Sequence, residues 1–186
     1  EARWGRAQGL ASHIYITVGT GVGVGIITNG RPVGGLGHSE AGHLRVGRLA
    51  GDTWAGACPW HGDCVEGLAS GAALAARLGH SAEGLSESDP VWDAVVHALA
   101  GLMHNLVLTA TPQRILIGGG VPSGKPWLLA RIQDALVESL AGYAHAAQLD
   151  MSQFLQVPGL GDRAGPMGAL ALALQARDKA SCRSAQ

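Results

Sequence analysis

Two cysteines and a histidine fall within seven residues of this chain, in the run Cys58-Pro59-Trp60-His61-Gly62-Asp63-Cys64. Thiolate and imidazole are ligands that Zn²⁺ prefers, and two residues between successive ligands let a loop turn around one tetrahedral ion. A buried turn that holds no metal is the alternative interpretation. The spacing predicts a metal clip, residues 58–64, with Cys58, His61 and Cys64 as three ligands.

A tetrahedral site needs a fourth ligand from outside the metal clip. His38 and His43 both lie within reach upstream, and His43 is favoured because it follows Glu40 by three residues, so that both groups can enter one pocket. Glu40, His43 and Glu66 are candidate ligands for the hydroxyl groups of a polyol. Exposed carboxylates that only face solvent are the alternative for the two glutamates.

Gly19-Thr20-Gly21 lies between two strand-like runs and is a candidate phosphate-binding turn. Glycine allows backbone N–H groups to close on an anion, and the threonine hydroxyl adds a donor. A tight hairpin that needs glycine only for positive φ is the alternative. The sixth position from Gly19 is Val24, so the dinucleotide-binding fingerprint is absent.

A second glycine run, residues 118–120, follows the short apolar strand expected at residues 114–117. The stretch from Gly119 to Lys125 has P-loop spacing, but Pro126 stands where Ser or Thr must hold Mg²⁺. A P-loop is therefore rejected. We expect instead that a base or ribose lies against Gly119 and Gly120.

These candidate residues need a sheet to position them. Strands are expected at residues 14–18 and 22–28, and Asn29-Gly30 is a strong hairpin signal. A third strand is expected near residues 44–46. Further strands are expected at residues 114–117 and 154–157, and helices at residues 64–79, 90–108, 126–141 and 167–176. This order predicts an α/β fold with a mixed sheet and flanking helices, with the candidate residues on its loops.

The composition is that of a globular protein, with 47% hydrophobic and 15% charged residues among 186 and a net charge of −1. The chain has no block of basic residues of the kind that predicts binding to nucleic acid or to a membrane. Three cysteines make no disulfide framework, and no signal peptide is recognisable, so a cytoplasmic location is expected. The low charged fraction indicates that a partner lobe or subunit covers part of the surface, and a homodimer is expected.

Five motifs in order resemble the ROK family of bacterial sugar kinases and repressors, over roughly residues 4–176. They are residues 15–23, 40–43, 58–66, 118–121 and 162–169. The histidine inside the metal clip resembles the fructokinase branch in particular. The resemblance implies an actin-like, ribonuclease-H-like ATPase fold, with residues 1–186 as the C-terminal lobe and residues 34–66 as its sugar and zinc region.

The resemblance also implies roles for individual residues. Sugar hydroxyls would be bound by Glu40, His43 and Glu66. A structural Zn²⁺ would be held by His43, Cys58, His61 and Cys64. ATP, accompanied by Mg²⁺, would be bound by Thr20, Gly21, Gly119 and Gly120.

The implied activity is ATP-dependent phosphorylation of a hexose, with fructose as the expected substrate. The family's first phosphate motif and its general-base aspartate have no match in this sequence and are expected upstream of Glu1. Phosphoryl transfer depends on both, so the chain alone is expected to be inactive. The sugar-sensing module of a ROK repressor is the alternative function.

Overall fold

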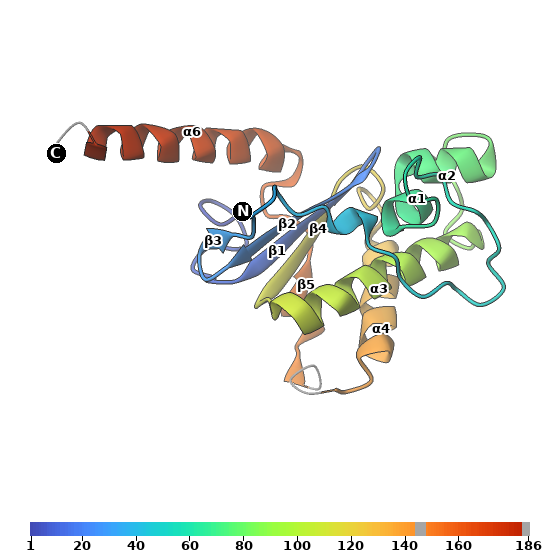
Figure 1. The fold of residues 1–186 in the computed structure, drawn as a ribbon. Helices are drawn as coiled ribbons and strands as arrows, with labels where there is room; N and C mark the ends of the chain where they lie inside the picture. Colours follow the sequence, from blue (N-terminus) through green and yellow to red (C-terminus); the bar gives the residue numbers. More distant parts are fainter. Residues whose placement is uncertain (144–147, 184–186) are drawn as a thin grey trace.

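A five-stranded mixed sheet lies at the centre of the structure, a computed structural model that describes residues 1–143 and 148–183 (Figure 1). The strands are β1 (His13–Val18), β2 (Val22–Thr28), β3 (Arg31–Pro32), β4 (Arg114–Gly118) and β5 (Leu155–Gln156). Their order in the sheet is β3-β2-β1-β4-β5. The pairs β1/β2 and β2/β3 are antiparallel, whereas β1/β4 and β4/β5 are parallel. The expected α/β fold with a mixed sheet is confirmed.

The Asn29-Gly30 turn joins β2 to β3, as the sequence predicts. Both residues have positive φ, 50° and 73°, as in the type I′ turns that match the twist of paired strands. The prediction of a third strand near residues 44–46 is wrong. These residues form no strand, and β3 pairs with the outer edge of β2 instead. The carbonyl of Leu44 accepts the backbone N–H of Val65 at 2.9 Å and so satisfies the start of a helix.

Helices flank the sheet. They are α1 (Val65–Ala69), α2 (Gly71–Leu78), α3 (Val91–Ala110), α4 (Pro126–Leu140), α5 (Met151–Phe154) and α6 (Ala164–Arg183), with 3₁₀ turns η1 (Ala41–His43) and η3 (Gly161–Arg163). The single helix expected at residues 64–79 is two helices. Ser70 has an extended backbone, and its Oγ accepts the N–H of Ala73 at 3.1 Å, so a new helix begins there.

The last helix begins three residues earlier than expected. Pro166 lies in the first turn of α6, where its missing N–H leaves no hydrogen bond unmade. α6 extends away from the sheet (Figure 1), and Leu170 and Leu172 on it are exposed.

Side chains alternate along β1 between a buried and a more open face. Ile14, Ile16 and Val18 are fully buried in the main core, where residues of α3 and α4 pack. Trp92 and Trp127 join these two helices edge to face at 5.3 Å. α3 is apolar and long enough to span a membrane, but 61% of its apolar window is buried within the fold, as in a core helix.

The parallel pairing of β1 and β4 positions the two glycine runs. Thr17 lies opposite Gly118 in the register, so both strands end at the same edge of the sheet. The backbone N–H of Gly71, at the start of α2, donates to the carbonyl of Gly19 at 2.7 Å. The candidate phosphate turn, the second glycine run and α2 therefore meet at one edge.

Candidate functional site: a Cys-His cluster beside two glycine turns

The metal clip is a tight hairpin closed by its own backbone. Cys58 and Gly62 exchange hydrogen bonds of 3.1 and 2.9 Å between their N–H and C=O groups. Gly62 has φ of 63°, a conformation that favours glycine. A Cβ on Gly67 would lie 1.9 Å from the carbonyl oxygen of Gly62, so α1 can approach the hairpin this closely only through a glycine.

The structure brings together the four residues expected to bind metal. Nδ1 of His43 lies 3.6 Å from Sγ of Cys58 and 3.5 Å from Sγ of Cys64. Nδ1 of His61 lies 3.7 Å from Sγ of Cys58, and all four donor atoms lie within 4.8 Å of one another. Tetrahedral zinc with ordinary Zn–S and Zn–N bonds has S···N edges of about 3.6 Å. The donor set therefore fits one tetrahedral ion.

The two sulfur atoms differ in their readiness to ionise. Burial raises the pKa of the Cys58 thiol, but backbone hydrogen bonds from His61 and Trp60 offset this and hold the pKa below its usual value. Burial is also the main reason that the pKa of Cys64 is raised to about 11. Cys58 therefore ionises more readily than Cys64, and a bound cation would favour the thiolate form of both.

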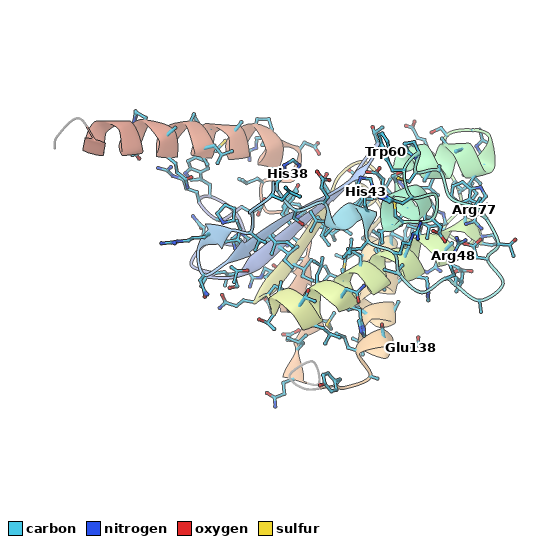
Figure 2. The ribbon with its side chains drawn as sticks, viewed as in Figure 1. His38, His43, Arg48, Trp60, Arg77 and Glu138 are labelled. Atoms are coloured by element: carbon cyan, nitrogen blue, oxygen red, sulfur yellow. The ribbon has the colours of Figure 1, made fainter. Side chains whose placement is uncertain are left out.

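Of the three candidate sugar ligands, His43 belongs to the cluster and Glu66 lies against it. Nδ1 of His43 is 3.9 Å from Oε1 of Glu66, and both side chains are about one-quarter exposed. Glu40 lies apart, with two-thirds of its side chain exposed and Oε1 2.8 Å from Nε2 of His38. The side chain of His38, labelled with His43 in Figure 2, pairs with Glu40, and among the described residues the cluster of donor atoms includes His43 and not His38.

Glu66 connects the cluster to the candidate phosphate turn. Its Oε2 accepts the backbone N–H of Val22, the first residue of β2, at 3.0 Å. A Cβ on Gly21 would lie 2.5 Å from the same oxygen, which accounts for glycine at this position. One carboxylate thus lies 3.9 Å from the Cys-His cluster with one oxygen and binds the turn between β1 and β2 with the other.

The residues expected to bind ATP lie at the edge where β1 and β4 end. Gly119 has φ of 100°, and a Cβ there would lie 2.5 Å from the carbonyl oxygen of Val18, so only glycine allows this approach. A cavity of about 840 Å³, here called the α2 groove, is lined by Thr20, Gly120 and small residues of α2. A second cavity of about 640 Å³ lies on the other side of the glycine run and includes Gly119. We favour the α2 groove for a nucleotide because both glycine turns line it.

Sequence reasoning missed a set of partly buried charges beside the metal clip. Arg48 and Asp52 lie in the irregular segment at residues 47–57 and contact Asp63 of the clip and Arg77 of α2. The four-residue spacing of Arg48 and Asp52 was the available signal, but it is also common on exposed helices.

The sequence model of the ROK family matches residues 1–176. This chain belongs to the ROK family. The fructokinase of Zymomonas mobilis is 38% identical over 182 residues, which are 96% of this chain and 60% of the relative. Among solved structures, a ROK hexokinase from Thermus thermophilus has a TM-score of 0.74 at 27% identity and is matched over 96% of this chain and 62% of its own.

A ROK family glucokinase from Streptomyces griseus, solved in complex with glucose and AMPPNP, has a TM-score of 0.65 at 28% identity, over 91% of this chain and 62% of its own. The resemblance inferred from the five motifs is thereby confirmed, together with the actin-like ATPase fold that it implied. The chain spans about 60% of the length of these relatives.

Proposed function

We propose that this chain is the C-terminal lobe of an ATP-dependent hexose kinase, and that the substrate is fructose. The observation that carries the proposal is the position of Glu66, which lies 3.9 Å from His43 and also binds the backbone beside Gly21. A sugar held by His43 and Glu66 would lie next to a phosphate held by the β1–β2 turn. Fructokinase relatives at this level of identity support fructose as the hexose.

The metal in this proposal is a structural Zn²⁺ held by His43, Cys58, His61 and Cys64. The fit of their spacing to a tetrahedron supports it. When bound, zinc would fix the fold of the clip. A His43 ring that uses Nδ1 for the metal keeps Nε2 for a sugar hydroxyl, and the metal thus sets the ring orientation and tautomer.

ATP is proposed to lie in the α2 groove, which Thr20 and Gly120 line, and to extend to Gly21 and Gly119, their neighbours in the two glycine turns. Backbone N–H groups of the turn and the Thr20 hydroxyl would bind phosphate oxygens, and Mg²⁺ would neutralise part of their charge. The glycine run would accept the flat face of the ribose or base. The general-base aspartate is proposed to lie outside residues 1–186. These residues alone would therefore not catalyse the phosphorylation.

Three further expectations belong to the same proposal. The protein would be cytoplasmic, would form a homodimer and would bind no nucleic acid. Sedimentation of the purified protein would measure its assembly state, and a monomer at working concentration would contradict the dimer.

Kinetic assays of the whole protein with ATP and Mg²⁺ test the function. We expect the highest kcat/KM on fructose among fructose, glucose, mannose and N-acetylated hexoses. Glu66→Gln should raise the KM for sugar at least tenfold, whereas the matched change Glu40→Gln should have a smaller effect, since Glu40 is exposed and paired with His38. If the protein phosphorylates none of these sugars, the proposed kinase activity is contradicted. Fructose binding without phosphorylation would instead favour the sensing module of a repressor.

A further inference from the structure

A chain of alternating charges runs through the segment at residues 47–57, which has no regular secondary structure. In order, its members are Arg77 of α2, Asp52 and Arg48 of the segment, and Asp63 of the metal clip. We propose that Arg48 is a positioning residue that holds the metal clip against α2 through this chain. The inference rests on the zinc site of the proposed function.

Arg48 has the contacts that such a role needs. Its Nη1 donates to Oδ2 of Asp63 at 3.2 Å, and its Nη2 donates to the carbonyl oxygens of Trp54 at 2.7 Å and Asp52 at 3.2 Å. The same Nη2 lies 3.1 Å from Oδ2 of Asp52. One planar guanidinium thus joins the clip to two points of the segment, and its side chain is only 27% exposed. Figure 2 labels Arg48 and Arg77 at the α1–α2 side of the molecule.

Asp52 anchors the other end of this chain of charges. Its side chain is 6% exposed. Its two carboxylate oxygens accept hydrogen bonds from Nη1 and Nη2 of Arg77, at 3.1 and 2.9 Å. Paired, two-point contacts of this kind are the strong class of charged hydrogen bond. The Arg77 guanidinium also lies over the ring of Trp54 at 5.3 Å, so the segment is fastened to α2 by polar and aromatic contacts together.

Arg45 provides an internal comparison. It also reaches the clip, with Nε 3.6 Å from Oδ1 of Asp63 and Nη2 donating to the carbonyl of His61 at 3.3 Å. Its side chain is 70% exposed, however, and exposed ion pairs of this kind contribute little. Two arginines thus contact the same aspartate. Of the two, Arg48 is the one that the described contacts also join to Asp52 and Trp54.

The position of Asp63 explains how this would act on the metal. Asp63 stands between Gly62, which closes the hairpin, and Cys64, which is a proposed ligand and caps α1. Fixing the Asp63 side chain limits the movement of both neighbours. Groups that hydrogen-bond directly to metal ligands change metal affinity by about 10–100-fold when they are removed, and Arg48, which acts through Asp63, is expected to fall at the lower end of that range.

Release of zinc to a chromogenic chelator tests the proposal. We expect Arg48→Ala to speed zinc loss at least tenfold relative to wild type and Arg45→Ala to speed it less than about threefold. Arg48→Lys should also lose zinc faster than wild type, because one ammonium group cannot bind Asp63, Asp52 and the Trp54 carbonyl together. Equal rates for Arg48→Ala and Arg45→Ala would overturn the proposal.

Two further measurements separate positioning from general stability. In Co²⁺-substituted protein, Arg48→Ala should weaken the visible bands of tetrahedral Co²⁺, whereas a merely structural arginine would leave them unchanged in the folded fraction. Asp63→Asn keeps the side-chain shape and should speed zinc loss at least fivefold, which tests the contact if Arg48→Ala does not fold. The Arg48→Ala/Asp63→Asn double variant should lose zinc no faster than the faster single variant, and multiplied effects would overturn a shared contact.

The outcomes also distinguish this proposal from the proposed function. Wild-type protein without zinc would overturn both the zinc site and the positioning role of Arg48. Wild-type protein that contains zinc and phosphorylates fructose, with equal rates for the two arginine variants, would overturn only the positioning role.

Discussion

The sheet core and the region around the metal clip are held in place by different forces. In the core, Ile14, Ile16 and Ile117 are almost fully buried, and their strands, β1 and β4, are each paired on both sides. The region at residues 34–66 contains only the short 3₁₀ turn η1 before α1 begins at Val65, and it exposes Trp60 at 81%. Its conformation depends on glycine contacts, on ion pairs and on the Cys-His cluster. Burial therefore holds the scaffold together, whereas polar contacts and the proposed metal ligands hold the site upon it.

The largest effect on this contrast should come from a change to a proposed metal ligand. Cys58→Ser should reduce zinc affinity at least 100-fold and increase proteolysis within residues 34–62, because the hairpin loses its shared ion. Far-ultraviolet circular dichroism should remain close to wild type, since none of the four proposed ligands belongs to the sheet or to the long helices. Trp60→Ala, an exposed change in the same hairpin, is the control and should keep its zinc. Full zinc retention by Cys58→Ser would contradict the assignment.

A core substitution should show the reverse pattern. Leu99→Ala removes a fully buried side chain of α3 and should lower the free energy of unfolding by about 3 kcal/mol, measured in urea. The folded fraction should still contain zinc in the wild-type ratio. Loss of zinc from folded Leu99→Ala protein would show that the two regions are not independently maintained.

Asp52→Asn should have an intermediate effect that depends on pH. Burial alone would raise the pKa of Asp52, but hydrogen bonds from Arg77 and from the Trp54 N–H, with the nearby arginine charges, hold that pKa below its usual value. A depressed pKa contributes stability above the unfolded value and loses it as pH falls through the folded value. The variant should therefore be less stable by about 2 kcal/mol at pH 7, and this difference should shrink below about pH 4.

Urea unfolding of wild type and Asp52→Asn across this range measures that difference. Arg177→Ala, in an exposed pair of α6, serves as the control and should change the free energy of unfolding by no more than about 0.5 kcal/mol at any pH. A difference between wild type and the Asp52→Asn variant that grows in acid would reverse the predicted sign.

The smallest effect should come from Lys125→Ala. Lys125 lines both cavities, and its Nζ lies 5.7 Å from the centre of the Trp92 ring, but Pro126 stands where a P-loop needs a hydroxyl. Stability should change by about 0.5 kcal/mol or less, and the KM for ATP by less than about threefold. A tenfold or greater rise in KM would show that this lysine binds phosphate.

Much of the site was predictable because its signals are local. The Cys-x-x-His-x-x-Cys spacing is set by the geometry of one turn, and the Asn-Gly pair determines its hairpin without help from distant residues. Glycine is found at positions 21 and 119 because Glu66 and β1 approach the backbone there too closely for a Cβ. The glycines can be recognised in the sequence, although the groups that approach them cannot.

The errors have a different origin. Whether residues 44–46 form a strand depends on which segment reaches the edge of β2, and that competition is tertiary. The break at Ser70 arises because one serine both ends α1 and caps α2. Arg48 contacts a residue 15 positions away in the sequence, and Asp52 contacts Arg77, 25 positions away. No local sequence pattern identifies contacts over such separations.

X-ray absorption at the zinc edge of the purified wild-type protein tests whether the Cys-His cluster holds zinc. We predict one zinc ion per chain, with two sulfur ligands at about 2.3 Å and two nitrogen ligands at about 2.0 Å. Protein without zinc after purification in the absence of chelators, or zinc with a shell of oxygen and nitrogen only, would contradict the account.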